Sequence, residues 1–261
     1  MTSQLTPGTA LVTGASSGIG EVYAERLARR GFDLLLVARN TERLVALANR
    51  LSAETGRKVE VVSADLAHLA HLEAVEARLR TDAAITLLIN NAGVLSNGPL
   101  AAAKPDDLGD MLTVNVIALT RLAAAAAAGF ASRKRGAIVN VSSAMAFIDT
   151  PDTAAYGASK AYVLNLTLAL NLELAPQGIQ LQAVLPGLTR TPMIGAGAGL
   201  PPEMVMETAD LVDTALIGFD RGELVTIPSL EAVSGYEDWT KTRQALQPHL
   251  SLSRPAARYA A

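Results

Sequence analysis

Ala10-Leu-Val-Thr-Gly-Ala-Ser-Ser-Gly-Ile-Gly20 is the stretch of the chain that decides its fold. The apolar run from Ala10 to Thr13 predicts a strand, and the glycines after it predict a tight turn. A helix follows, in which Ile19, Tyr23 and Leu27 repeat every four residues. Glycines let the backbone approach a ligand, so amide groups at such a turn can face a phosphate. The spacing Gly-x-x-x-Gly-x-Gly differs from the commonest dinucleotide pattern, and a plain strand-to-helix turn is the alternative interpretation.

The same alternation of strand and helix continues along the chain. Apolar runs that predict strands lie at 33–38, 59–63, 85–90, 137–142, 179–184 and 223–227. Helical patterns lie between them, at about 42–54, 67–81, 106–131 and 154–174. Continuous apolar strands separated by helices predict a parallel sheet, and right-handed crossovers make it doubly wound. We therefore expect an α/β fold of a single domain over residues 1–261, a Rossmann-like parallel sheet with helices on both faces.

Two segments depart from this alternation. Four glycines and three prolines gather between residues 187 and 202. We therefore expect residues 188–208 to form a mobile loop that closes over a substrate. Residues from about 228 to 261 are expected to form a loosely held C-terminal extension.

Charge and composition argue against several kinds of partner. The chain has 22 Lys and Arg against 25 Asp and Glu, a net charge of -3, and so lacks the basic excess of a nucleic-acid binder. It has no cysteine, which excludes disulfides and thiolate metal sites. His68 and His71 lack an evident third ligand, so no metal site is expected. Residues 1–7 do not resemble a signal peptide, and the apolar run 122–131 is shorter than the roughly 20 residues that span a bilayer. We expect a cytoplasmic protein that binds neither nucleic acid nor membranes.

The end of the second predicted strand indicates which nucleotide would bind. A carboxylate at this place would accept hydrogen bonds from a ribose 2′-hydroxyl and favour NAD(H). The chain has Ala38 there, followed by Arg39, whose guanidinium suits a 2′-phosphate. Asp33 stands at the wrong end of the strand to replace the missing carboxylate. We therefore predict NADP(H), with NAD(H) as the weaker choice. The alternative interpretation is that Arg39 is only a solvated surface charge.

Tyr156 and Lys160 are four residues apart in a helical pattern, which places both on one face. A nearby cation favours a phenolate and lowers the pKa of a tyrosine, which can then exchange a proton with a carbonyl or alcohol oxygen. Alone, such a pair is most often an ordinary amphipathic pair. Its context favours catalysis, because polar residues and glycines gather at the carboxyl ends of successive strands, where doubly wound sheets bind ligands. These strand ends are Asn90-Asn-Ala-Gly93, Asn140-Val-Ser-Ser143 and Pro186-Gly187, the last followed by Thr189 and Thr191.

In order and spacing these motifs resemble those of the short-chain dehydrogenase/reductase family, over about residues 8–192. The matching positions are Thr13-Gly14-x-x-x-Gly18-x-Gly20, Asn90-Asn91-Ala92-Gly93, Asn115, Ser143, Tyr156-x-x-x-Lys160 and Pro186-Gly187-x-x-x-Thr191. The resemblance implies that Tyr156 is the general acid and base, and that Lys160 lowers its pKa and binds the nicotinamide ribose. Ser143 would hydrogen-bond the substrate oxygen, with Ser142 as the weaker candidate. Asn115 would hold a water that links Lys160 to solvent.

The resemblance also implies a set of cofactor contacts. Together with Arg39, the implied residues are Gly14, Ser16, Ser17, Gly18, Ile19, Gly20, Asp65, Leu66, Asn91, Ala92, Gly93, Tyr156, Lys160, Pro186, Gly187, Thr189 and Thr191. Many NADP-preferring members of the family carry a second basic residue where this chain has Ser17. The last predicted strand also lacks the Asp-Gly-Gly ending that is common in the family.

These expectations combine into an NADPH-dependent oxidoreductase that interconverts a carbonyl and a primary or secondary alcohol. Apolar residues near the expected nicotinamide favour a hydrophobic ketone, aldehyde or acyl substrate. They are Met145, Phe147, Met193, Ile194, Leu200, Met204 and Met206. The alternatives are a nucleotide-binding regulatory protein without turnover and an NAD-dependent epimerase or dehydratase. The resemblance further implies a homodimer or homotetramer, formed through helices 106–131 and 154–174.

Overall fold

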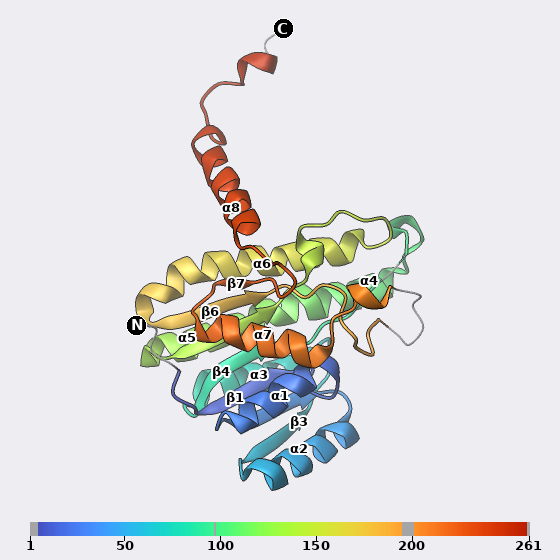
Figure 1. Cartoon of the computed structure of the whole chain (residues 1–261), viewed down its shortest axis with the longest axis vertical. Helices are drawn as coiled ribbons and strands as arrows, with labels where there is room; N and C mark the ends of the chain where they lie inside the picture. Colours follow the sequence, from blue (N-terminus) through green and yellow to red (C-terminus); the bar gives the residue numbers. More distant parts are fainter. Residues whose placement is uncertain (1–4, 97, 195–200, 260–261) are drawn as a thin grey trace. The chain divides into compact units, whose positions relative to one another are not determined.

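Seven parallel strands form the central sheet of the protein, in the spatial order β3-β2-β1-β4-β5-β6-β7 (Figure 1). The computed structural model describes residues 5–96, 98–194 and 201–259. The strands are β1 (Thr9–Thr13), β2 (Asp33–Ala38), β3 (Val59–Ser63), β4 (Ile85–Asn90), β5 (Gly136–Val141), β6 (Ile179–Val184) and β7 (Val225–Thr226). The order reverses between β1 and β4, as in a doubly wound sheet. The predicted α/β fold is confirmed.

Helices cover both faces of this sheet. They are α1 (Gly18–Arg29), α2 (Thr41–Thr55), α3 (Leu69–Thr81), α4 (Pro105–Leu112), α5 (Leu119–Arg133), α6 (Ala154–Leu174), α7 (Thr208–Asp220) and α8 (Ser234–Leu246). Apolar side chains of α1, α2 and α7 pack into one core, on one face of the sheet. Those of α3 and α5, with the end of α6, pack into a second core on the other face. Every residue of β4 and β5 is buried, as a strand covered on both faces requires.

The predicted helix over 106–131 is made of three parts. Helix α4 begins with Pro105 in its first turn, and a π-helical turn from Thr113 to Ala118 joins α4 to α5. A π-turn is wider than an α-turn and is found frequently at functional sites. The whole segment Pro105–Arg133 is long and apolar enough to cross a membrane, but half of its most apolar window is buried inside the protein. The core helix of a soluble protein passes the same test.

The chain divides into two compact units, Met1–Pro228 and Ser229–Ala261. The first holds the sheet and helices α1 to α7. The second holds α8 and two short 3₁₀ turns, Gln247–His249 and Ala257–Tyr259, and none of the residues of α8 is buried. Sequence analysis did not predict α7 or α8, and it placed the last strand at 223–227, whereas only Val225 and Thr226 pair with β6.

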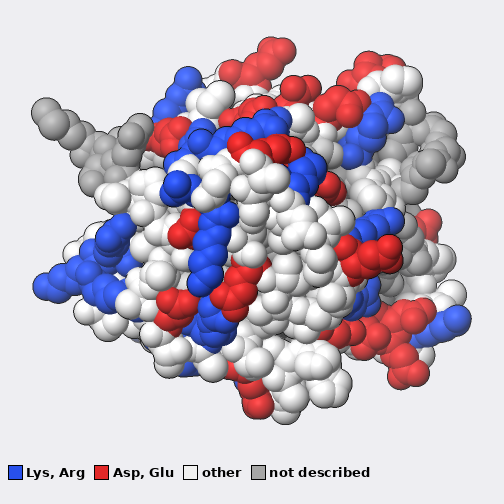
Figure 2. Space-filling model, turned by 90° about the horizontal axis from the view of Figure 1, so that it is seen from below, with Lys and Arg blue, Asp and Glu red and all other residues white. Residues whose placement is uncertain are grey.

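Ion pairs connect the helices on one face of the sheet. Arg26 of α1 pairs with Asp213 of α7 at 2.7 Å, and Arg50 of α2 pairs with Glu25 of α1. Figure 2 shows one face of the molecule, on which acidic and basic side chains lie interleaved. Exposed ion pairs of this kind each contribute at most about 1 kcal/mol, so the two apolar cores account for most of the stability.

Candidate active site

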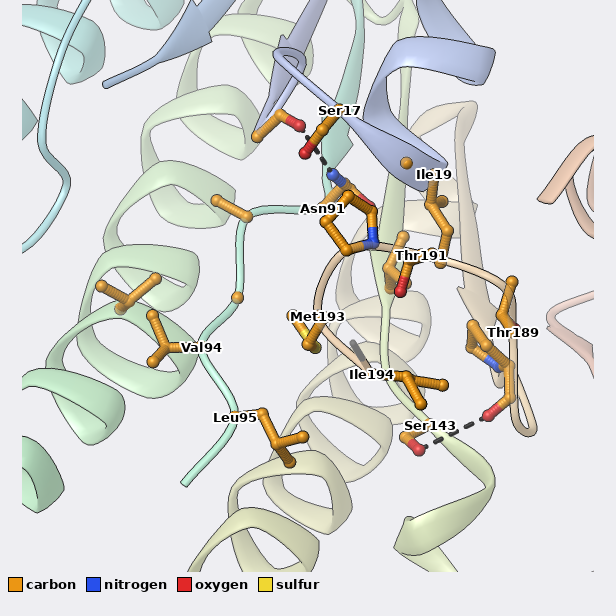
Figure 3. A pocket seen from close by; sticks show the side chains of 18 of the residues that line it. Ser17, Ile19, Asn91, Val94, Leu95, Ser143, Thr189, Thr191, Met193 and Ile194 are labelled. Carbon is orange, nitrogen blue, oxygen red and sulfur yellow. Dashed lines mark hydrogen bonds between the residues drawn. The ribbon is translucent and has the colours of Figure 1, made fainter. Parts of the chain in front are cut away.

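A cavity of about 670 Å³ opens at the carboxyl ends of the strands, and residues that follow β1 to β6 line it. Figure 3 shows the labelled side chains of these loops arranged around one common space. Most of the predicted site residues line this cavity, namely Gly14, Ser16, Ser17, Gly18, Ile19, Arg39, Asp65, Leu66, Asn91, Ala92, Gly93, Ser143, Tyr156, Lys160, Pro186, Gly187, Thr189 and Thr191. Gly20 and Asn115 are buried but do not line it.

Gly14 and Gly20, at the turn after β1, leave no room for a side chain. Gly14 has φ +67°, and its amide donates to the Val37 carbonyl at 2.8 Å. A Cβ at Gly20 would lie 2.4 Å from the Gly14 carbonyl oxygen, which is a steric clash. Helix α1 begins at Gly18, so its first amide groups face the cavity beside this loop. Free amides at a helix N-terminus, beside a loop whose glycines allow close approach of the backbone, fit a pyrophosphate.

Hydrogen bonds join the glycine loop to the loop after β4. The hydroxyl of Thr13 accepts from the amides of Asn91 and Ala92 at 2.9 and 3.0 Å. The Asn91 side-chain amide donates to the Thr13 carbonyl at 2.9 Å. The resemblance implies that Asn91, Ala92 and Gly93 contact the adenosine ribose of the cofactor, whereas it includes Thr13 as a motif position without a stated role. Its buried hydroxyl fixes the position of both loops.

Arg39 is exposed and lines the cavity directly after β2. It forms no ion pair within the described part of the chain. Asn40 begins α2, where its side-chain oxygen accepts from the Arg43 amide at 2.9 Å. A guanidinium beside the N-terminus of a long helix is an environment that suits a phosphate group.

Asp65 and Leu66 line the cavity after β3. The Asp65 amide donates to Nδ1 of His71 at 3.2 Å, and its carboxylate accepts from the Ala67 amide at 3.0 Å. The rings of His68 and His71 lie 4.6 Å apart, and within the described ranges no three His, Cys, Asp or Glu side chains form a metal site. His71 therefore holds the loop of Asp65.

Lys160 is buried next to Tyr156. Its Nζ donates to the Val141 carbonyl at 3.0 Å and lies 5.7 Å from the centre of the Tyr156 ring. Only 4% of Lys160 is exposed, and this burial lowers the pKa of its ammonium to about 8. The group is still mostly protonated at pH 7 and provides a fixed positive charge at the edge of the cavity.

The pKa of Tyr156 differs from the expectation. Burial raises the pKa of this phenol, because a phenolate loses hydration inside the protein, and a hydrogen bond with Ser143 partly opposes the rise. Sequence spacing suggested that Lys160 lowers this pKa. In the protein alone burial is the largest influence, and Ser143 is the group that favours the phenolate. Ser143 also accepts from the Met145 amide at 3.1 Å.

Asn115 lies in the π-helical turn and is fully buried. Its side-chain oxygen accepts from the Val94 amide at 2.8 Å, and its nitrogen donates to the Val94 carbonyl at 2.8 Å and to Ser159 at 3.3 Å. The amide therefore holds the loop after β4. A Cβ at Gly93 would lie 3.4 Å from the Asn115 oxygen and 3.5 Å from Lys160 Nζ, so both groups lie close to Gly93. The side chain is fully engaged, and its predicted water relay stays a prediction.

The other part of the cavity wall is apolar. Of the residues expected there, Met145, Met193 and Ile194 line the cavity, whereas Phe147, Met204 and Met206 do not. Leu200 lies outside the described residues. Further apolar residues that the sequence did not predict also line the cavity, among them Val94, Leu95, Val114, Ile148 and Leu188.

A short β-bridge closes the base of the predicted substrate loop. Thr189 bridges Met206, and the Met206 amide donates to the Leu188 carbonyl at 2.9 Å. The Arg190 amide donates to the Met206 carbonyl at 2.9 Å, and the Thr208 hydroxyl donates to the Arg190 carbonyl. The described part of this loop on its β6 side includes Met193 and Ile194, which face the cavity (Figure 3).

Comparison with known proteins agrees with this geometry. A sequence model of the short chain dehydrogenase family matches residues 8–197. This chain belongs to that family. A solved short-chain dehydrogenase from Sphingobium yanoikuyae, in complex with NADPH, is 50% identical with a TM-score of 0.94, and the match covers 97% of this chain and 100% of that one. A bulky-bulky ketone specific alcohol dehydrogenase from Comamonas testosteroni is 46% identical with a TM-score of 0.91, over 97% of this chain and 99% of that one.

Curated relatives of the short-chain dehydrogenase family match over a smaller part of their length. Human inactive hydroxysteroid dehydrogenase-like protein 1 is 34% identical over 186 residues, which are 70% of this chain and 56% of that protein. The chain spans the same share, 56%, of two similar vertebrate proteins.

Proposed function

We propose that this member of the short-chain dehydrogenase family is an NADPH-dependent oxidoreductase that interconverts a carbonyl and an alcohol, with Tyr156 as its general acid and base. One observation carries the proposal. The phenol of Tyr156 and the hydroxyl of Ser143 share one cavity with the buried ammonium of Lys160 and with the glycine loop. A phenol, a hydroxyl and a fixed cation around one space are the groups that proton transfer to a carbonyl oxygen requires.

Each of these groups has a separate task in the proposed reduction. The nicotinamide, when bound, supplies hydride to the carbonyl carbon. The Ser143 hydroxyl donates a hydrogen bond to the carbonyl oxygen and fixes its position. The Tyr156 hydroxyl gives its proton to that oxygen, and the Lys160 ammonium stabilises the phenolate that remains. A solvent proton then restores the phenol. Alcohol oxidation runs through the same steps in reverse.

The wall of the cavity provides the contacts that would hold the cofactor. The glycine loop and the first amides of α1 fit the pyrophosphate, and Asp65 with Leu66 stands where the adenine would bind. Pro186, Gly187, Thr189 and Thr191 follow β6 and would contact the cofactor, with Thr189 and Thr191 holding the carboxamide of the nicotinamide. These assignments rest on the family resemblance and on shared membership of one cavity wall.

The preference for NADPH rests on Arg39 and on the missing carboxylate at Ala38. The solved relative from S. yanoikuyae is in complex with NADPH, which supports the same choice. Arg39→Ala is expected to lower kcat/KM for NADPH about tenfold or more, because a charge-assisted hydrogen bond contributes about 1.5–3 kcal/mol. Turnover with NADH should change little. Arg43→Ala, which removes a neighbouring exposed arginine that does not line the cavity, is the control. A parent enzyme with higher kcat/KM for NADH would overturn the preference.

The substrate proposed is a ketone with an apolar group on each side of its carbonyl. Val94, Leu95 and Val114 line the cavity from the β4 side, and Met193 with Ile194 lines it from the β6 side. The relative from C. testosteroni is named for bulky-bulky ketones, which supports this class. NADPH consumption is measured with small ketones and with ketones that carry two large groups. Val94→Phe should narrow one side and slow only the bulky ketones. Equal loss for acetone would contradict a role in size selection.

A regulatory protein that binds nucleotide without turnover is the second candidate. It is favoured by the human relative, which carries the word inactive in its name. Consumption of NADPH with any of the ketones excludes it, and such net consumption also separates a reductase from an epimerase, which returns its cofactor unchanged. Tyr156→Phe provides the decisive comparison, since turnover as fast as the parent's would remove Tyr156 from the mechanism.

We also propose a cytoplasmic homodimer or homotetramer that forms through the helices over 106–131 and 154–174. Ile117 and Leu172 are 50% and 79% exposed on this helical surface, and apolar side chains there would be covered in an oligomer. Light scattering that gives the mass of one chain would overturn the oligomer.

A further inference from the structure

Ser142 stands between β5 and the proposed catalytic serine, and it makes a contact that the proposed mechanism does not use. Its hydroxyl donates to the main-chain carbonyl of Lys160 at 2.6 Å, and only 2% of the residue is exposed. Its own amide donates to the Val184 carbonyl at 2.8 Å. The side chain therefore points into α6, at the residue whose ammonium lies beside the Tyr156 ring.

The last residue of β5 and the residue after it hold the two ends of Lys160. Val141 accepts from Nζ at 3.0 Å, while Ser142 donates to the main-chain carbonyl. Within a helix that carbonyl already accepts from the amide four residues later. The hydrogen bond from Ser142 is therefore not required to satisfy it. Its effect is to fix where α6 lies along β5 at the level of Lys160.

Loss of this contact would leave the Ser142 hydroxyl without a partner, whereas the Lys160 carbonyl would keep its hydrogen bond within the helix. If α6 slid or rotated at Lys160, the Ser142 hydroxyl would be left buried without a partner, which is unfavourable. The ammonium would move with the helix, and the Coulomb interaction that stabilises the phenolate falls as the two charges separate. The position of Lys160 along β5 therefore depends on a hydroxyl that is bonded to its main-chain carbonyl.

We propose that Ser142 is a positioning residue, which holds the Lys160 ammonium at the distance from Tyr156 that catalysis requires. This inference rests on the proposed function and extends it. Ser142 acts through Lys160, whereas Ser143 contacts the reacting oxygen.

The test compares the pH dependence of kcat for alcohol oxidation with NADP⁺. Tyr156 must lose its proton in this direction, so kcat rises with pH to a plateau. In Ser142→Ala the ammonium is held less firmly, the phenolate is less stable, and the midpoint of the rise moves to higher pH. At pH 7 kcat should fall about three- to tenfold, the range expected for one buried hydrogen bond. It should recover toward the parent's plateau at higher pH.

Thr167→Val is the matched control. Thr167 is also a fully buried hydroxyl that joins α6 to β5, since it accepts from the Asn140 side chain at 3.0 Å and donates to the Val163 carbonyl at 2.8 Å. It lies seven residues beyond Lys160, which is about two helical turns. This variant should lose stability and keep the parent's midpoint. Ser142→Thr, which restores the hydroxyl, should return the midpoint to that of the parent.

An unchanged midpoint in Ser142→Ala, or an equal shift in the Thr167 control, would overturn the inference. The inference would also be overturned if Ser142→Thr had the same pH midpoint of kcat as Ser142→Ala. If Ser142→Ala does not fold, Ser142→Cys has a weaker donor at the same place and should show a smaller shift in the same direction. Failure of the proposed function looks different, because Tyr156→Phe would then match the parent or the parent would not turn over.

Discussion

Lys160→Met is expected to stabilise the cofactor-free protein at neutral pH while it removes catalysis. Burial lowers the pKa of Lys160 from its ordinary value of 10.5 to about 8. Between these two values the unfolded chain holds more protons at this position than the folded chain does. The free energy of unfolding of the parent therefore rises with pH across this window. Below pH 8 the buried ammonium is a full cost to stability.

The magnitude follows from the size of the pKa change. A shift of about 2.5 units corresponds to about 3 kcal/mol, because one unit is worth about 1.4 kcal/mol. The methionine variant also loses the 3.0 Å hydrogen bond to the Val141 carbonyl, which contributes about 1 kcal/mol. At pH 7 the variant should therefore be more stable by about 2 kcal/mol. Above pH 10.5 the order should reverse, because the parent no longer carries the buried charge.

Urea unfolding of both proteins at pH 7 and pH 10.5, without cofactor, measures these differences. Lys104→Met removes an exposed lysine and should change the free energy of unfolding by less than about 0.5 kcal/mol at either pH. The reasoning is refuted if the Lys160 variant is less stable than the parent at pH 7. It is also refuted if the gap between the two proteins does not change with pH.

Three further predictions test the packing and the site. Gly20→Ala should destabilise the protein by about 1–3 kcal/mol and weaken NADPH binding, because the new Cβ would lie 2.4 Å from a backbone oxygen. Gly109→Ala, where the new Cβ would have nothing within 4 Å, should instead stabilise α4 by about 0.5–1 kcal/mol. Equal urea-unfolding midpoints for the two variants would contradict this prediction. Leu122→Ala, at a side chain with 0% exposure, should cost about 2–5 kcal/mol in urea unfolding; a cost below 1 kcal/mol would not fit a core position. Ser143→Ala should move the pH midpoint of alcohol oxidation upward, because the hydrogen bond that lowers the pKa of Tyr156 is lost, and it should also reduce the plateau of kcat; an unchanged plateau would exclude Ser143 from contact with the substrate oxygen.

Most of the sheet could be predicted because its strands are buried on both faces. In the run 85–90, Leu87, Leu88 and Ile89 are consecutive apolar residues and polar Asn90 and Asn91 follow them, so the pattern marks where the strand ends. Helix α7 was missed although Leu211, Ala215 and Phe219 repeat at helical spacing and are buried. It follows a stretch rich in glycine and proline, a composition that predicts a loop as far as residue 208. The π-turn could not be predicted, because over a single turn the sequence pattern does not distinguish 3.6 residues per turn from the larger number in a π-helix.

The site residues at strand ends could be predicted because topology brings the carboxyl ends of parallel strands to one edge. The apolar wall of the cavity could not be predicted, because the conformations of loops determine which side chains line it. Ile148 lines the cavity while Phe147 beside it does not, and no periodicity distinguishes the two. The predicted direction of the pKa shift of Tyr156 was wrong for a similar reason. The spacing to Lys160 can be counted along a helix, whereas the burial that outweighs it depends on the folded surroundings.

The bridge between Thr189 and Met206 also has a consequence for how such an enzyme can diversify. The bridge holds the two ends of the intervening segment next to each other. The end of β6 and the start of α7 therefore keep their relative positions whatever segment connects them. The entropy of closing a loop grows only logarithmically, at about 0.6 kcal/mol for each doubling of length. Segments of other lengths and compositions could therefore be grafted between Thr191 and Met206 at little energetic cost. The protein would then accept new ketones while the machinery that moves its proton and hydride stays in place.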